Sequence, residues 1–263
     1  MDLGLSGKVA LVTGGSRGIG RATALTLARE GCRVAICARG QERLQRTLAE
    51  LATLSTPSWG CVADVTQAEN VEHFVSEAAE TLGGVDALIC NVGGTAGGAS
   101  LEASDEEWMT TIDLNLMHAV RTIRAAVPYL KQRHQSRIVI VSSISGWKPG
   151  PKAQYGAAKA AEIFLSLSLA WEFSSHRIGV NTVCPGSIYF PGSGWAAFEQ
   201  DHPEEYAQFL DRELPENRLG SDQEVADVIT FLVSERARWI NGAMIPVDGA
   251  QGRPTGRWFE PSV

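Results

Sequence analysis

The residues best suited to chemistry are a tyrosine and a lysine four positions apart, Tyr155 and Lys159. Residues at i and i+4 share one face of a helix, so the phenol and the ammonium are expected to point into one site. A free phenol titrates near ~10, and a neighbouring cation favours its ionised form. The spacing predicts an acid–base pair, although a surface helix can carry the same two residues by chance.

Ser143 stands twelve residues before Tyr155 and two residues after the end of an apolar run at Val141. A side chain at the carboxyl end of such a strand would lie at the sheet edge where α/β proteins bind ligands. Its hydroxyl is expected to hold a substrate oxygen close to the phenol. No G-x-S-x-G elbow is present, so a serine hydrolase is unsupported.

A glycine-rich turn follows the first apolar run, Val9–Val12, and comes just before a helical pattern over residues 18–30. Glycines allow a tight turn and a close approach of the backbone to a pyrophosphate at a helix N-terminus. A turn of this kind is weak evidence alone, because many tight turns bind nothing. Its place in the first strand–turn–helix unit favours a dinucleotide site.

The second apolar run ends at Ala38 and Arg39, where a carboxylate would select NAD(H). Arg17, in the glycine turn, can approach the same place from the other side. Guanidinium groups suit phosphate oxygens, so the pair favours a 2′-phosphate and therefore NADP(H), with NAD(H) still possible. The alternative is that both arginines are solvated surface residues.

Composition excludes several classes of protein. The chain has 263 residues, of which 44% are hydrophobic and 20% charged, and this is typical of a globular protein. A formal net charge of −7 gives no electrostatic reason to bind nucleic acid or anionic lipid. No apolar stretch approaches the ~20 residues of a membrane span, and no signal peptide is recognisable, so we expect a cytoplasmic protein. The five cysteines form no C-x-x-C pair and the histidines are scattered, so no metal site is expected.

Apolar runs alternate with helical patterns along the whole chain, which predicts parallel strands joined by right-handed crossovers. We expect an α/β fold, a single doubly wound Rossmann domain over residues 1–263 with a mostly parallel seven-stranded sheet and helices on both faces. Thr66, Ser104 and Ser221 are expected to begin helices. The expected strands are Val9–Val12, Val34–Cys37, Gly60–Ala63, Ala87–Cys90, Ile138–Val141, Val180–Val183 and Ala243–Val247, and the expected helices cover 18–30, 41–54, 67–82, 104–134, 153–175 and 222–234.

Residues 187–217 interrupt this alternation with an insertion rich in aromatic side chains. We interpret it as a substrate-binding lid, against the alternative of two surface helices packed on the body. Residues 250–263 form a tail with Trp258 and Phe259. The helix over 153–175 carries a further apolar row, which favours a homo-oligomer, expected to be a tetramer, over simple coverage of the sheet; the row is Ala157, Ala160, Phe164, Leu167 and Trp171.

These motifs together resemble the short-chain dehydrogenase/reductase family over nearly the whole chain. The matching segments are Thr13–Gly20, Asp64-Val65, Asn91–Gly94, Asn115, Ser143, Tyr155, Lys159, Pro185-Gly186 and Val247–Gly249. The resemblance implies that Tyr155 is the acid–base, that Ser143 rather than Ser142 orients the carbonyl or alcohol, and that Asn115 holds a water. It implies that Lys159 binds the nicotinamide ribose and lowers the pKa of the phenol.

The resemblance also implies the remaining contacts. Those to the cofactor are Gly14, Ser16, Arg17, Gly18, Ile19, Gly20, Arg39, Asp64, Val65, Asn91, Gly93, Tyr155, Lys159, Pro185, Gly186 and Ile188; those to the substrate are Ser143, Trp147, Tyr155, Tyr189 and Trp195. The family's usual Asn-Asn-Ala-Gly appears here as Asn91–Gly94, with valine and glycine in the middle.

The expected activity is that of an NADP-dependent carbonyl reductase or alcohol dehydrogenase acting on a small molecule. A 3-oxoacyl thioester reductase, an NAD-linked alcohol dehydrogenase and a non-catalytic cofactor sensor are the alternatives.

Overall fold

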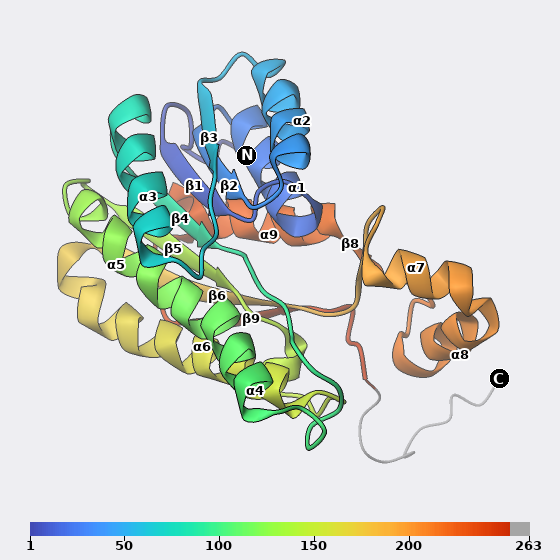
Figure 1. Ribbon diagram of the computed structural model, residues 1–263. Helices are drawn as coiled ribbons and strands as arrows, with labels where there is room; N and C mark the ends of the chain where they lie inside the picture. Colours follow the sequence, from blue (N-terminus) through green and yellow to red (C-terminus); the bar gives the residue numbers. More distant parts are fainter. Residues whose placement is uncertain (253–263) are drawn as a thin grey trace.

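Seven parallel strands form one central sheet in the computed structural model, which describes residues 1–252 (Figure 1). The strand order is β3-β2-β1-β4-β5-β6-β9, and every neighbouring pair is parallel. The doubly wound fold predicted from the sequence is confirmed. The strands are β1 Val9–Thr13, β2 Arg33–Ala38, β3 Ser58–Val62, β4 Ala87–Cys90, β5 Ser136–Val141, β6 Ile178–Pro185 and β9 Met244–Val247.

Helices cover both faces of the sheet, and each face has its own apolar core. Side chains of α1, α2 and α9 pack on one face, whereas those of α3, α5 and α6 pack on the other. The inner strands are apolar along nearly their full length because both faces are buried. These helices are α1 Gly18–Arg29, α2 Gln41–Ala52, α3 Ala68–Leu82, α5 His118–Leu130, α6 Ala153–Phe173 and α9 Asp222–Val233.

The strand order reverses between β1 and β4. The chain runs outward from β1 through β2 to β3, then returns to the other side of β1 to form β4, β5 and β6. Connections on the two sides of this point leave in opposite directions and open a crevice at the carboxyl ends of the strands. The topology therefore places the glycine turn after β1 beside the segments that follow β4 and β5.

The prediction of a single helix over residues 104–134 is wrong in detail. The structure has α4 Asp105–Ile112, a π-helical turn Asp113–Met117 and α5, which follow one another without a loop. A π-helical turn inside a helix is uncommon and is often found at functional sites. This turn carries Asn115, which the structure buries.

Helix starts follow the predicted chemistry at two of three positions. Ser104 and Ser221 each form a capping box with a glutamate three residues later. The expectation for Thr66 is wrong, because α3 begins two residues later and the Thr66 hydroxyl instead donates to Asp64, at 2.8 Å. An aspartate two residues away offers this hydroxyl a closer partner than the helix.

The 187–217 segment forms a helical pair that projects from the body (Figure 1). It contains β7 Ile188–Tyr189, α7 Gly194–Asp201 and α8 Pro203–Glu213, and β7 pairs with β8 Gly220–Ser221. The aromatic rings of α7 and α8 pack on each other, with the Trp195 and Phe209 centroids 4.5 Å apart. The pair of helices considered as an alternative therefore exists, but its aromatic side chains form their own cluster.

Three short 3-10 helices complete the described elements, at Ile144–Gly146, Ser174–His176 and Glu235–Ala237. No helix within residues 1–252 is long and apolar enough to cross a lipid bilayer. Of the predicted tail, only residues 250–252 are described, so Trp258 and Phe259 lie outside the described residues. The side chain of Gln251 is buried and accepts a hydrogen bond from the Ser187 backbone N–H at 2.7 Å.

Candidate active site

A cleft of about 540 Å³ lies at the carboxyl edge of the sheet, at the reversal of strand order. Every residue predicted to contact the cofactor lines it, and so do Ser143 and Trp195. These residues come from segments that follow β1, β2, β3, β4, β5 and β6, which only the parallel sheet brings together. The cleft therefore joins the predicted phosphate turn and the predicted acid–base pair in one site.

The glycine turn is shaped for close backbone approach. A Cβ on Gly20 would lie 2.3 Å from the Gly14 carbonyl oxygen, and Gly18 has φ +50° with the Phe190 ring 2.7 Å from where its Cβ would be. Helix α1 begins at Gly18 and has no side-chain cap at its N-terminus. Uncapped backbone N–H groups at a helix start bind anions, so this turn fits a phosphate group.

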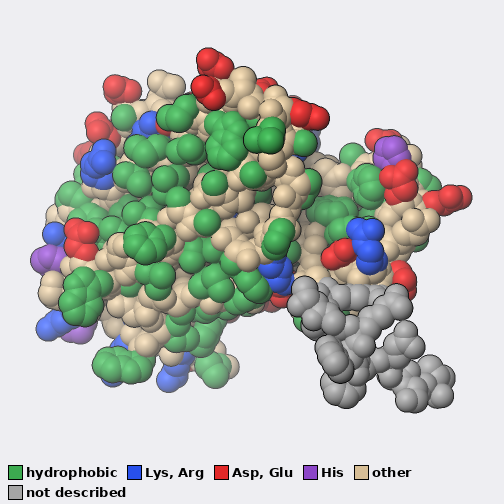
Figure 2. Space-filling view, turned by 90° about the horizontal axis from the view of Figure 1, so that it is seen from below, with side chains coloured by type: hydrophobic (Ala, Val, Ile, Leu, Met, Phe, Trp, Pro, Cys, Tyr) green, Lys and Arg blue, Asp and Glu red, His purple; other side chains and the backbone are tan. Residues whose placement is uncertain are grey.

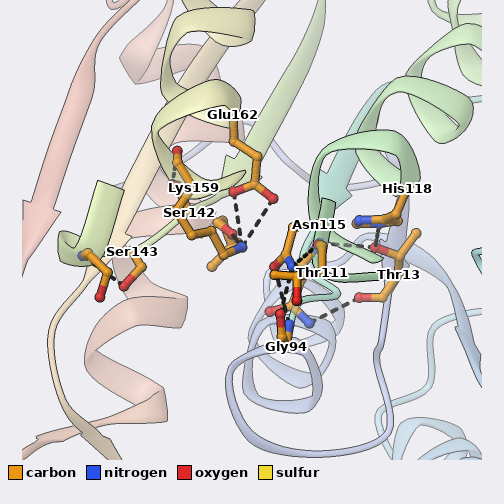
Figure 3. Close-up of polar contacts among 12 residues, drawn as sticks. Thr13, Gly94, Thr111, Asn115, His118, Ser142, Ser143, Lys159 and Glu162 are labelled. Atoms are coloured by element: carbon orange, nitrogen blue, oxygen red, sulfur yellow. Dashed lines mark hydrogen bonds and ion pairs between the residues drawn. The ribbon is translucent and has the colours of Figure 1, made fainter. Parts of the chain in front are cut away.

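Asn91 ties the glycine turn to the end of β4. Its side-chain amide donates to the carbonyl oxygens of Thr13 at 3.0 Å and Gly14 at 3.3 Å, and its backbone N–H donates to the Thr13 hydroxyl at 3.0 Å. The same hydroxyl lies 2.9 Å from Nε2 of His118 (Figure 3). Burial lowers the pKa of His118 to about 3, so this imidazole is uncharged at neutral pH.

Three guanidinium groups line the other end of the cleft. Arg17 and Arg39 lie where the sequence predicted them, and Arg43, which the sequence reasoning missed, joins them from the first turn of α2. The sequence did offer a signal for Arg43, because this residue lies in the first turn of the helix expected directly after the second strand. Nearby, Asp64 accepts hydrogen bonds from the backbone and hydroxyl of Thr66, which lower the pKa of the carboxyl.

Three of the four residues predicted to be catalytic, Ser143, Tyr155 and Lys159, line the same cleft. Ser143 follows β5, and its hydroxyl accepts a hydrogen bond from the Ser145 backbone N–H at 3.1 Å. Tyr155 and Lys159 lie one turn apart on α6, with the Lys159 ammonium 5.7 Å from the centre of the Tyr155 ring. Gly146 allows the loop after Ser143 to approach α6, because a Cβ there would lie 2.9 Å from the Lys159 carbonyl carbon.

The Lys159 ammonium has a partner that the sequence reasoning missed, Glu162. The two Glu162 oxygens lie 3.1 and 3.0 Å from the lysine Nζ, which also donates to the Val141 carbonyl at 3.1 Å (Figure 3). Both side chains are almost completely buried, at 2% and 1% exposed. The signal available in the sequence was an acid three residues after the lysine, one helical turn away on the same helix.

Asn115 lies behind the cleft and not in its lining. Its side-chain amide donates to the carbonyl oxygens of Gly94 at 2.7 Å and Thr111 at 2.6 Å, and its oxygen accepts from the Gly94 N–H at 3.2 Å (Figure 3). These bonds fix the loop after β4 against the π-helical turn. The water-holding role implied for Asn115 stays a prediction.

The predicted substrate contacts are only partly brought together. Trp195 reaches the cleft from α7, and Phe190, which was not predicted, joins it there. Trp147 and Tyr189 are exposed and do not line the cleft, and the Trp147 ring lies instead beneath the Lys148 ammonium, at 4.6 Å. A role for these two side chains in substrate binding stays a prediction.

Comparison with known proteins agrees with this geometry. Residues 8–196 match the family profile described as short chain dehydrogenase. The chain is 34% identical over 244 residues to the 3-oxoacyl-(acyl-carrier-protein) reductase FabG of Staphylococcus aureus, covering 92% of this chain and 97% of that protein. It is 32% identical over 247 residues to 2-(S)-hydroxypropyl-CoM dehydrogenase 3 of Xanthobacter autotrophicus, covering 93% and 96%.

Comparison with solved structures also finds similar oxidoreductases. An L-sorbose reductase from Gluconobacter frateurii, complexed with NADPH and L-sorbose, is similar with a TM-score of 0.88 and 33% identity over 95% of this chain and 98% of that one. An NADPH-bound short chain oxidoreductase from Pseudomonas aeruginosa is similar with a TM-score of 0.89 and 33% identity, covering 95% and 99%.

Proposed function

Because the chain belongs to the short chain dehydrogenase family of oxidoreductases, we propose that it moves a hydride between NADP(H) and a carbonyl or secondary alcohol. The observation that carries this proposal is the single cleft in which Ser143, Tyr155 and Lys159 face the glycine turn. The fold alone would not carry it, since the same architecture serves many functions. The proposed chemistry rests on the side chains at the carboxyl edge of the sheet.

The bound nicotinamide supplies the hydride in reduction and accepts it in oxidation. In reduction, the Tyr155 hydroxyl donates its proton to the substrate oxygen as the carbonyl carbon becomes tetrahedral. The Ser143 hydroxyl donates a hydrogen bond to the same oxygen and thereby fixes its distance from the phenol. In oxidation the phenolate takes the proton back, and the Lys159 ammonium stabilises its negative charge.

NADP(H) is the proposed cofactor because Arg17, Arg39 and Arg43 line the cleft where a 2′-phosphate would lie, and no carboxylate ends β2. The glycine turn and the uncapped start of α1 would hold the pyrophosphate. The NADPH bound to the similar reductases from Gluconobacter and Pseudomonas supports this choice. An NAD-linked reaction is the alternative that cofactor titration tests.

A 3-oxoacyl thioester is a second candidate substrate, which the 34% identity to the staphylococcal reductase favours. The similarity to an L-sorbose reductase favours a polar ketone instead. A panel of thioesters, sugars and small ketones, followed by NADPH absorbance, separates the two candidates. NADPH binding with no turnover across the panel would favour the cofactor-sensing module over the enzyme.

We also propose that the protein forms a homo-oligomer, a tetramer by family resemblance. The apolar row on α6 faces outward, with Phe164 70%, Leu167 47% and Trp171 88% exposed, so it does not simply cover the sheet. Hydrophobic side chains gather on this side of the molecule (Figure 2). An exposed apolar helix face supports an isologous contact with a second copy. Light scattering that reports a monomer at working concentration would contradict the proposal.

A further inference from the structure

Glu162 is the one acidic side chain on the buried face of α6, and its carboxylate points at the ammonium that faces the cleft. Its exposed fraction is 1%, and its neighbours on the same face are Ala158, Ser166 and Ala170. A carboxylate is seldom buried to this extent, and a buried ion pair often adds little to stability compared with apolar side chains of the same size. The presence of this pair at the cleft therefore points to a role in chemistry.

We propose that Glu162 is a positioning residue whose carboxylate keeps the almost completely buried Lys159 ammonium charged. The role rests on the proposed function, in which that ammonium serves the cofactor and the Tyr155 phenol. Two contacts hold the ammonium, since Nζ donates to the Val141 carbonyl and lies within 3.1 Å of both Glu162 oxygens. The carboxylate supplies the charge that the carbonyl lacks.

The electrostatics of the pocket support this role. Burial has the largest influence on the pKa of Lys159 and lowers it, but Glu162 and Tyr155 more than offset this and hold the pKa above its ordinary value. Burial also raises the pKa of the Glu162 carboxyl, and the ammonium opposes that rise. Each charge therefore supports the other, as expected when an ion pair lies in a medium of low dielectric constant.

Among the other titratable groups that face this pair, the histidine and the two cysteines supply no negative charge at neutral pH. His118 on α5 is uncharged because burial lowers its pKa to about 3. Burial raises the pKa of Cys184 on β6 to about 11 and raises that of Cys90 on β4, so both remain thiols. The Tyr155 phenol on α6 is the group that the ammonium serves. Within residues 1–252, Glu162 is the carboxylate that contacts this ammonium.

The loop after β4 leaves room for the Lys159 ammonium beside Glu162. A Cβ on Gly93 would lie 2.9 Å from both Lys159 Nζ and Asn115 Oδ1. The family pattern has alanine at this position, whereas this chain has glycine. Glycine therefore lets the ammonium lie between α6, β5 and the π-helical turn, in reach of Glu162.

The direct test is the titration of the Lys159 ammonium in the cofactor-free protein, followed by NMR of ¹³Cε-labelled lysine and assigned with Lys159→Arg. We expect the Lys159 ammonium of the wild type to lose its proton only above the ordinary range of a lysine, and the midpoint of this titration in Glu162→Gln to fall by about two pH units or more, as for unpaired buried lysines. As the control, Ser166→Ala removes a different buried polar group from α6, the hydroxyl one turn from Glu162, and its lysine should titrate as in the wild type. Equal midpoints in the wild type and Glu162→Gln would overturn the proposal.

A kinetic readout separates positioning from simple stabilisation. In Glu162→Gln, kcat/KM should fall about tenfold per pH unit above the new lysine midpoint and recover at lower pH. A merely structural role would lower the rate by the same factor at every pH. If Glu162→Gln does not fold, Glu162→Asp serves instead, with an intermediate midpoint expected and an unmoved midpoint contradicting the proposal. A wild type without turnover would contradict the proposed function, while the NMR titration would still decide the role of Glu162.

Discussion

Removing the Arg39 guanidinium should weaken the binding of NADPH while leaving the binding of NADH nearly unchanged. Arg39 lines the cleft just beyond β2 and is exposed to solvent, so it can meet a 2′-phosphate without the cost of burying a charge. A hydrogen bond to a charged group contributes about 1.5–3 kcal/mol when well formed, but solvent exposure reduces this. We therefore expect Arg39→Ala to raise the Kd of NADPH by about tenfold, or ~1.4 kcal/mol.

The assay is a fluorescence titration of both cofactors with the wild type, Arg39→Ala and Arg39→Ala/Arg43→Ala. The double variant should lose more affinity for NADPH, because Arg43 lines the same end of the cleft. Arg46→Ala is the matched control: Arg46 lies on the same helix but pairs with Glu42 and does not line the cleft. The preference for NADPH should also weaken as salt is added. Equal losses for NADPH and NADH in Arg39→Ala, or a wild type that binds NADH as tightly, would refute the reasoning.

Three further predictions test other parts of the site. Trp195→Ala should raise KM for the carbonyl substrate several-fold with little change in NADPH affinity, measured by steady-state kinetics beside titration, because Trp195 closes one side of the cleft. Gly93→Ala should lower kcat by about tenfold or more, since the added methyl group would lie 2.9 Å from the Lys159 ammonium and the Asn115 oxygen; an unchanged kcat would show that the loop yields freely. His118 has a pKa of about 3 when folded, below its ordinary value, so the stability that it supports is complete above about pH 6.5 and is lost as the pH falls towards 3. Denaturant unfolding should show a loss of about 1.4 kcal/mol per pH unit in that window, and a smaller one in His118→Gln.

The sequence predicted the sheet and the placement of Tyr155 beside Lys159 because both depend on short-range patterns. Apolar runs such as Val9–Val12 and Ile138–Val141 are buried on both faces, so their composition alone marks them as strands. Tyr155 and Lys159 lie on one helix at a spacing that fixes their common face. Such relations do not depend on the rest of the chain.

The parts that the sequence did not predict depend on contacts between distant segments. The π-helical turn at Asp113–Met117 lets Asn115 bond to the loop at Gly94, a relation over twenty-one residues that no local pattern contains. Trp147 was expected to contact the substrate, but the loop places its ring at the surface, beneath the Lys148 ammonium. The role of Glu162 was missed because a single acid on a helix is most often solvated, and only the packing of α6 on the sheet buries it.

The central claim is that Tyr155 gives and takes the proton in a hydride-transfer reaction, and Tyr155→Phe tests it most directly. The variant keeps the ring and its packing but loses the ionisable oxygen, so NADPH should bind within about threefold of the wild-type Kd, since the phosphate turn and Arg39 are intact. General acid catalysis contributes about 10²–10⁴-fold, and kcat with the best carbonyl substrate should fall by a factor in that range. Measuring NADPH binding and turnover side by side on the same two proteins separates lost chemistry from lost cofactor. A Tyr155→Phe enzyme that turns over at the wild-type rate would contradict the account.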